Sequence, residues 1–170
     1  PLGPQPGEAL GVARTQELLP ARPLDGGRQY FTRAKDFGYS KTAEETLSVW
    51  DRQGVLSDMV RVIREFRPDV IITRFPTDST AGHGHHQASA ILAEEAFRAA
   101  ADTTRFFEQL AHVRPWQAKR IVWNAFRFDP TREPSPAPYV SVDLGVYNRL
   151  LGRAYTEIAA ESRSIHKSQG

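Results

Sequence analysis

The stretch that decides the fold reads Asp69-Val-Ile-Ile-Thr-Arg-Phe75. A run of β-branched residues without polar alternation predicts a strand that is covered on both faces, as in a parallel sheet. The segment before it, 55–66, has the apolar periodicity of an amphipathic helix and is stopped by Arg67-Pro68. A polar loop and a second helical segment, 87–101, follow the strand. This order of helix, strand, loop and helix predicts an α/β fold.

The spacing of apolar residues also predicts which side of each helix is buried. On helix 87–101 the inward residues are predicted to be Ala88, Ile91, Leu92 and Ala96. On helix 55–66 the inner face is predicted to hold Val55, Met59, Val62, Ile63 and Phe66, whereas Arg61, Arg64 and Glu65 face solvent.

The remaining segments have weaker signals for helices, strands and a loop. A helix is expected over 8–19, where Pro20 ends it, and another over 146–162. A third is expected from Thr42 onward, because Thr42 and Glu45 have the spacing of a capping box. Strands are expected over 29–32, 120–124 and 139–143, and a surface loop over 129–138. We expect one α/β domain over residues 1–170, N-terminally incomplete and belonging to a longer polypeptide.

Composition excludes several classes of protein. The 170 residues are 40% apolar and 25% charged, which are globular values. The net charge of +2 includes no basic block long enough to suggest nucleic-acid binding. Without cysteine there is neither a disulfide nor a Cys-ligated metal. No apolar run approaches the roughly 20 residues that span a bilayer, so no membrane span is expected, and the compartment is left open.

The loop after the central strand, Asp78-Ser-Thr-Ala-Gly-His-Gly-His-His-Gln87, carries three of the five histidines. His83 and His86 are three residues apart, and such residues share one face of a helical turn, whereas His85 points elsewhere. Neutral imidazole is a common zinc ligand, and the loop lies where open α/β sheets place their chemistry. A metal or catalytic role is therefore one interpretation; solvated histidines, one of them capping the next helix, are the other.

Two motifs resemble the PIG-L/LmbE family of zinc-dependent de-N-acetylases. Gly82-His-Gly-His-His86 is similar to the family's Gly-His-x-x-His motif, and Ser164-Ile-His-Lys-Ser-Gln169 is similar to its C-terminal His-x-Ser-Gln motif. Arg14 and Glu17, three residues apart, fit the family's early helix. The matches and the element order between them cover nearly the whole chain.

The resemblance implies a three-layer α/β/α Rossmann-like fold with a mostly parallel sheet. It implies Zn²⁺ bound by His86, and His83 as the residue that stabilises the tetrahedral intermediate and acts as general acid. The family's His-Pro-Asp-Asp-Glu motif is not in this sequence. The other zinc ligands, the general base and the first strands are therefore expected upstream of Pro1, in a missing segment of the same polypeptide.

Three further residues are candidates for the site. Asp78 could orient a histidine, although an Asx turn is the more common role. Arg74 could hold an anionic or sugar substrate or form a salt bridge. His166 is either a cation at a helix end or, by the resemblance, a site residue.

The predicted function is zinc-dependent removal of an N-acetyl group from an N-acetylglucosaminyl-type amino sugar conjugate. The alternative is an inactive relative, a non-catalytic α/β module that binds a sugar or a nucleotide. No phosphate-binding glycine loop favours the nucleotide. The oligomeric state is left open.

Overall fold

The computed structural model describes residues 8–125 and 139–169. The chain divides into two compact units, Phe31–Arg132, here called the histidine unit, and Pro1–Tyr30 with Glu133–Gly170, here called the terminal unit. The single domain over residues 1–170 stays a prediction.

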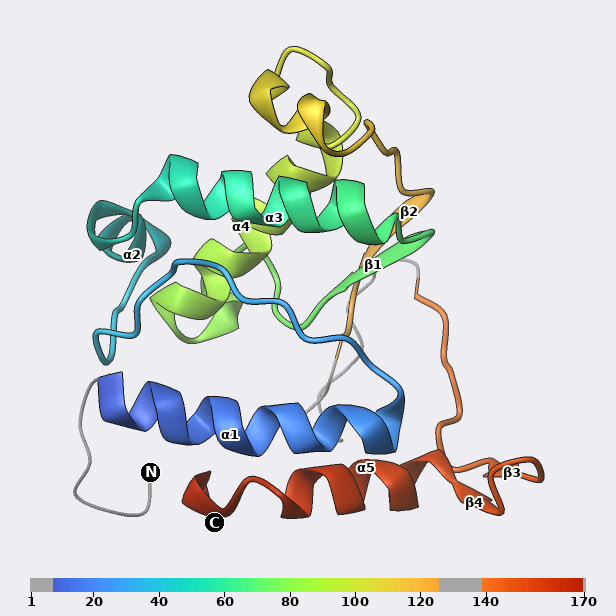
Figure 1. Ribbon diagram of the computed structural model, residues 1–170. Helices are drawn as coiled ribbons and strands as arrows, with labels where there is room; N and C mark the ends of the chain where they lie inside the picture. Colours follow the sequence, from blue (N-terminus) through green and yellow to red (C-terminus); the bar gives the residue numbers. More distant parts are fainter. Residues whose placement is uncertain (1–7, 126–138, 170) are drawn as a thin grey trace. The chain divides into compact units, whose positions relative to one another are not determined.

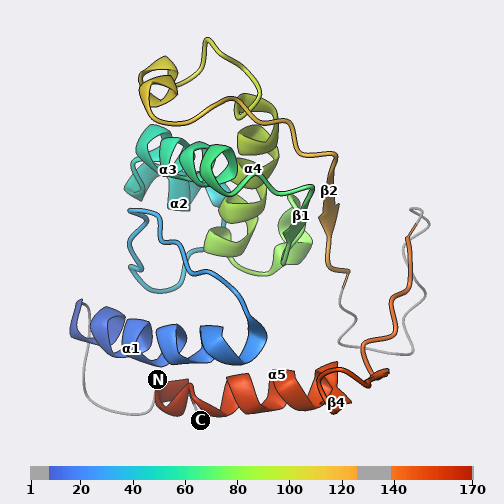
Figure 2. The same ribbon diagram turned by 45° about the vertical axis from the view of Figure 1, so that its right-hand side comes forward.

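The histidine unit holds a short parallel sheet and the helices that pack beside it (Figures 1 and 2). Its elements in chain order are α2 (Ala43–Val49), α3 (Arg52–Phe66), β1 (Val70–Thr73), η1 (Ser79–Ala81), α4 (Gly84–Ala99), η2 (Phe107–Ala111) and β2 (Arg120–Trp123). The two strands pair in parallel, with Ile71 opposite Ile121 and Thr73 opposite Trp123. The predicted mixture of helices with a small parallel sheet is confirmed.

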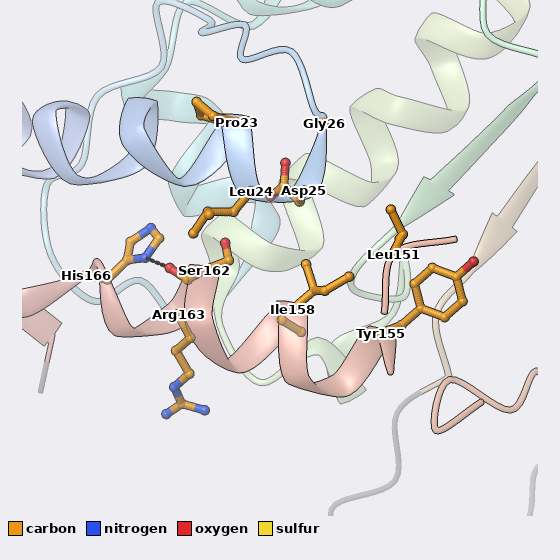
Figure 3. A pocket seen from close by; sticks show the side chains of 11 residues that line it. Pro23, Leu24, Asp25, Gly26, Leu151, Tyr155, Ile158, Ser162, Arg163 and His166 are labelled. Carbon is orange, nitrogen blue, oxygen red and sulfur yellow. Dashed lines mark hydrogen bonds between the residues drawn. The ribbon is translucent and has the colours of Figure 1, made fainter. Parts of the chain in front are cut away.

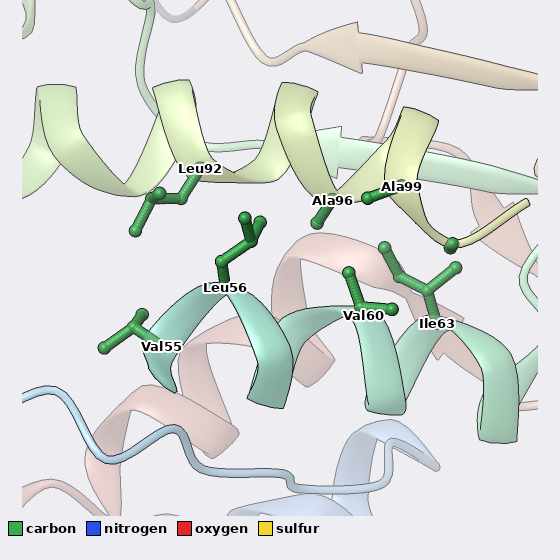
Figure 4. Close-up of a cluster of buried hydrophobic side chains, with 8 residues drawn as sticks. Val55, Leu56, Val60, Ile63, Leu92, Ala96 and Ala99 are labelled. Carbon is green, nitrogen blue, oxygen red and sulfur yellow. The ribbon is translucent and has the colours of Figure 1, made fainter. Parts of the chain in front are cut away.

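The core of the histidine unit lies between α3 and α4, whose apolar side chains face each other (Figure 4). Ile71 of β1 packs against this core, so the helices cover one face of the sheet. The other face is open in the described residues: Ile72 is 65% exposed and Val70 is 45% exposed. The described residues therefore cover β1 on one face only, and the predicted cover on its second face stays a prediction.

The buried face of α3 differs from the predicted one. Phe66 is 51% exposed, whereas Arg64, predicted to face solvent, is 1% exposed. The Arg64 guanidinium donates hydrogen bonds to the carbonyls of Ala99 and Ala100 at the end of α4, at 3.2 and 3.1 Å, and to three more carbonyls in the segment that follows. A helix end leaves carbonyls without intrahelical donors, and a buried arginine supplies several from one side chain.

The helix start predicted at Thr42 is confirmed. The Thr42 hydroxyl accepts a hydrogen bond from the Glu45 N–H at 3.2 Å. The Glu45 carboxylate accepts from the N–H of Lys41 at 2.8 Å, one residue before the position that a capping box predicts. In α4, Ala88, Leu92 and Ala96 are fully buried as predicted.

The terminal unit is built on two helices that lie side by side, α1 (Glu8–Asp25) and α5 (Tyr155–Ser164). It also contains β3 (Tyr147–Asn148), β4 (Arg153–Ala154) and η3 (Lys167–Gln169). α1 continues past Pro20, where the sequence predicts its end, and also contains Pro23. A proline inside a helix lacks its N–H, and its ring crowds the carbonyl four residues before it. Ala21, between the two prolines, is wholly buried.

Three other predictions differ from the structure. Residues 29–32 and 139–143 form no strand, and Val140 is 89% exposed. The helix predicted from residue 146 begins at Tyr155, because the Asn148 side chain accepts the N–H groups of Leu150 and Leu151 and makes a turn. The loop predicted over 129–138 lies outside the described residues. None of the helices in the described ranges has the length and apolar character of a membrane span.

Candidate functional site

The histidine stretch follows the carboxyl end of β1, where α/β proteins place functional side chains. Asp78 begins a tight turn there, because its carboxylate accepts hydrogen bonds from the N–H and the hydroxyl of Thr80. These two bonds lower the pKa of Asp78, with the hydroxyl as the larger cause. Gly82 then closes η1 in the left-handed region, at φ 73°, and leads into His83, the N-cap of α4. This turn therefore sets the position of His83 at the start of α4.

The first residue of α4 packs closely against the segment that leads into α2. The Gly84 N–H donates to the carbonyl of Ser40 at 2.8 Å. A Cβ on Gly84 would lie 2.2 Å from both Ser40 Oγ and the Thr42 carbonyl oxygen. The Gln87 side chain adds a bridge, accepting from the Ala43 N–H at 3.2 Å and donating to the Thr77 carbonyl at 3.1 Å. Two segments some forty residues apart are thereby locked together.

His86 is held in the orientation typical of a metal ligand. Its Nδ1 lies 3.2 Å from the carbonyl oxygen of Ala81. Because a carbonyl oxygen only accepts, Nδ1 carries the proton and Nε2 keeps its lone pair. The ring also stacks on Phe75, with ring centroids 3.6 Å apart and planes inclined by 3°. Metal-binding histidines commonly donate their other ring N–H to a backbone carbonyl in this way.

His83 has the opposite hydrogen bonding. Its Nδ1 accepts the N–H of His85 at 3.1 Å, which caps α4. The lone pair of Nδ1 is therefore engaged, and in neutral imidazole the proton sits on Nε2. The His83 ring lies with its centroid 5.0 Å from that of His86 and 4.9 Å from that of Tyr39. One histidine thus offers a lone pair and its neighbour offers a proton.

The His85 ring packs against aromatic side chains and does not share the environment of His83 and His86. Its ring stacks on Trp50 at 5.2 Å and meets the edge of Phe37 at 4.5 Å. Burial, with a smaller contribution from His83, lowers the pKa of His85 below its ordinary value. Its Nε2 is buried without a hydrogen-bond partner in the described residues. Although its centroid is 4.7 Å from that of His83, the aromatic neighbours make His85 part of the wall that supports the site.

The described residues supply at most part of the ligands that a zinc ion needs. Catalytic zinc takes three protein ligands and keeps one position open. Across the described ranges, no group of three histidine, cysteine, aspartate or glutamate side chains is placed to hold a metal ion. Among the three histidines that follow β1, His86 is the one whose Nδ1 donates to a backbone carbonyl in the described residues, which leaves its Nε2 lone pair for a metal.

Arg74 and Asp78 lie in the segment between β1 and the histidines. Within the described residues the hydrogen bonds of Asp78 go to Thr80 and not to a histidine, so its Asx turn is what the structure contains. The Arg74 guanidinium carbon lies 5.6 Å from the ring centroid of Phe75, and the Phe75 ring also stacks on His86. A role for Arg74 in substrate binding stays a prediction.

His166 belongs to the terminal unit. Its Nδ1 lies 3.2 Å from the Ser162 carbonyl oxygen and therefore donates to it, and the ring lines a pocket of about 670 Å³ between α1 and α5 (Figure 3). Next to it in sequence, Ser168 donates its N–H and its hydroxyl to the Glu17 carboxylate, both at 2.6 Å. These bonds lower the pKa of Glu17, the hydroxyl being the largest cause. The tail motif thus closes on the early helix, and a site role for His166 stays a prediction.

Sequence patterns missed the aromatic residues around the histidines. Phe37, Tyr39 and Trp50 come from the chain before and after α2, and Phe75 comes from the end of β1. The sequence feature that could have indicated them is Phe37 and Tyr39 on either side of Gly38, because these aromatic residues belong to no apolar periodicity and precede a helix cap.

The protein thus has an α/β unit, in which two histidines of opposite hydrogen bonding follow a parallel strand, and a largely helical terminal unit. A family model for PIG-L, described as GlcNAc-PI de-N-acetylase, matches residues 2–97, which is more than half of the chain. The protein therefore belongs to the PIG-L family. The matched residues include the histidine stretch and end before His166. No curated protein is found that matches this chain.

Proposed function

We propose that this protein is a zinc-dependent N-deacetylase acting on an N-acetylglucosaminyl-type amino sugar conjugate. Its family model is described as GlcNAc-PI de-N-acetylase, which supports this reaction type and this kind of substrate. The observation that carries the proposal is the opposite hydrogen bonding of two histidines three residues apart. His86 donates through Nδ1 and has Nε2 free, whereas His83 accepts through Nδ1 and has its proton on Nε2.

In this proposal His86 is a zinc ligand through Nε2. The Ala81 carbonyl fixes its tautomer, and Phe75 fixes the plane of its ring. The resemblance assigns the remaining ligands and the general base to a motif that the family carries upstream of Pro1. When bound, zinc supplies a water of lowered pKa and polarises the carbonyl of the acetyl group.

His83 is proposed to face the reacting carbonyl. Its Nε2–H is a donor for the oxygen on which negative charge develops, and a donor fixed beforehand is worth most in a site from which water is excluded. To act as general acid toward the leaving amine, His83 needs a second proton on Nδ1. That proton requires the His85 N–H···Nδ1 hydrogen bond to break. We therefore propose His83 as an oxyanion donor while this cap is in place, and as a general acid only after α4 loses it.

The three-layer α/β/α arrangement with a mostly parallel sheet is part of the proposal. What supports it is the open face of the sheet, where Ile72 and Val122 are 65% and 42% exposed. Large exposed apolar patches are uncommon on isolated soluble proteins, and a second helical layer would cover this one.

The test uses the full-length protein, including its upstream region, after loading with zinc and dialysis. His86→Ala should lose bound zinc, measured by elemental analysis, together with acetyl release from N-acetylglucosamine derivatives. His83→Ala should keep zinc and lose turnover by about 10²–10³-fold, the scale of one oxyanion donor. His112→Ala is the matched control, since this histidine is exposed at the end of η2.

Zinc retention and full activity in His86→Ala would refute the assignment. A wild-type protein that binds the sugar but neither holds zinc nor releases acetate would instead be the non-catalytic binding module.

A further inference from the structure

Two aromatic side chains stand exposed beside the histidines. Tyr39 is 67% exposed and Phe37 is 37% exposed. The Tyr39 ring meets the His83 ring edge-on, at 4.9 Å and 77°, and Phe37 meets His85 in the same manner, at 4.5 Å and 73°. Exposed aromatic rings next to a candidate reactive group are a common sign of a ligand surface.

The short loop that carries these rings is fixed at both ends. Before it, the Trp50 indole N–H donates to the Lys35 carbonyl at 2.8 Å. After it, the carbonyl of Ser40 accepts the N–H of Gly84 at 2.8 Å, and the wholly buried Ser40 hydroxyl pairs with that of Thr46 at 2.6 Å. The second anchor is the first residue of α4, so the loop is joined directly to the helix that carries the histidines.

The backbone between the two rings also has a defined shape. Gly38 lies between them at φ 92°, a conformation that residues with a side chain rarely adopt, and its N–H donates to the Asp36 carboxylate at 2.9 Å. This turn places the two rings against two neighbouring histidines instead of against the core. The Tyr39 hydroxyl makes no hydrogen bond to the described residues, which leaves it available to a ligand.

We propose that the Phe37–Tyr39 loop is the subsite that binds the pyranose ring of the N-acetylated amino sugar, with Tyr39 stacking on its face of C–H groups. The inference rests on the proposed function and adds to it which part of the substrate is recognised. A pyranose has an apolar face rimmed by hydroxyl groups, and tyrosine matches it with an apolar ring and a polar tip. Because Tyr39 touches His83, a sugar held on Tyr39 has its N-acetyl group within reach of that histidine.

The experiment compares a cyclic with an acyclic substrate on the zinc-loaded full-length protein. The substrates are methyl N-acetyl-β-glucosaminide and N-acetylethanolamine, which has the same amide but no ring. The variants are Tyr39→Ala, Tyr39→Phe and the control Tyr147→Ala, an exposed tyrosine of β3 (59% exposed).

Tyr39→Ala should raise KM for the glucosaminide about three- to tenfold, the scale of one aromatic contact, with kcat unchanged within about twofold. Tyr39→Phe keeps the ring and loses only the hydroxyl, so it should raise KM for the glucosaminide less than Tyr39→Ala does, and N-acetylethanolamine should not distinguish the variants. An unchanged KM for the glucosaminide in Tyr39→Ala would overturn the inference. So would an equal loss of kcat on both substrates, since Tyr39 would then only orient His83.

A binding measurement separates this inference from the proposed function. If the wild-type protein releases no acetate, saturation-transfer NMR with the same glucosaminide still tests the subsite. Loss of transfer to the sugar ring protons in Tyr39→Ala, with transfer kept in Tyr147→Ala, supports the subsite although the proposed chemistry has failed. Absence of sugar binding by the wild-type protein, or transfer unaffected in Tyr39→Ala, overturns the subsite.

Discussion

Replacing Gly84 by alanine tests the contact that holds the histidines in place. Gly84 begins α4, and its added Cβ would lie 2.2 Å from two oxygens, Ser40 Oγ and the carbonyl of Thr42. The Thr46 hydroxyl would be a third neighbour at 2.7 Å, where ordinary contacts begin at 3.4 Å. A buried serine and a backbone carbonyl have little freedom to retreat, so the start of α4 must move away by about 1 Å.

The magnitude follows from three contributions. Forcing a methyl group into a filled space costs about 3 kcal/mol, the upper part of the usual range for overpacking. Loss of the Gly84 N–H···Ser40 hydrogen bond adds about 1 kcal/mol. Alanine recovers at most about 1 kcal/mol through its higher helix propensity. We therefore expect the free energy of unfolding to fall by about 3 kcal/mol.

Urea unfolding measures this loss. With a slope of about 2 kcal/mol per molar urea, the midpoint should fall by about 1.5 M. Gly11→Ala is the matched control: it lies within α1, a Cβ there meets nothing within 4 Å, and it should stabilise slightly. Ser40→Ala should rescue Gly84→Ala only in part, because the Thr42 carbonyl remains. A Gly84→Ala protein as stable as wild type would refute the close-approach argument.

Three further changes test other contacts. Arg64→Met should lower the free energy of unfolding by about 3 kcal/mol in the same urea assay, because several carbonyls lose their hydrogen-bond donor. Arg61 is exposed, so Arg61→Met should change the free energy of unfolding by no more than about 0.5 kcal/mol. The Arg33 side-chain hydrogen bond lowers the pKa of Asp58 in the folded protein. The Asp58 carboxylate therefore stabilises the fold above its unfolded pKa of about 4, and this contribution is lost as pH falls through the lower folded pKa. Asp58→Asn should flatten this part of the curve of stability against pH, and an unchanged curve would contradict the pairing. Glu17→Gln should speed amide hydrogen exchange at residues 165–169, and equal exchange in both proteins would show that the tail is held by other contacts.

The sequence predicted the elements that depend on local chemistry. The strand at β1, the cap at Thr42 and the helical spacing of α4 each depend on residues within one element, and these three predictions are confirmed, although one face of β1 is open in the described residues. The failures involve partners distant in sequence. Arg64 is buried because carbonyls 35 or more residues away need its donors. α1 runs through two prolines, past the end that local chemistry predicts at Pro20, and it packs along α5.

The candidate site shows the same division between local pattern and tertiary contact. The spacing of His83 and His86 is visible in the sequence, but spacing alone does not distinguish a ligand from a donor. The distinction comes from two backbone groups, the Ala81 carbonyl and the His85 N–H, which fix opposite tautomers in adjacent rings. Both groups are placed by the turn at Gly82 and by the first turn of α4, and that helix is in turn held by its contact with Ser40. The roles of the two histidines therefore depend on how closely α2 and α4 approach each other, which is why Gly84, a residue with no side chain, is central to the proposed chemistry.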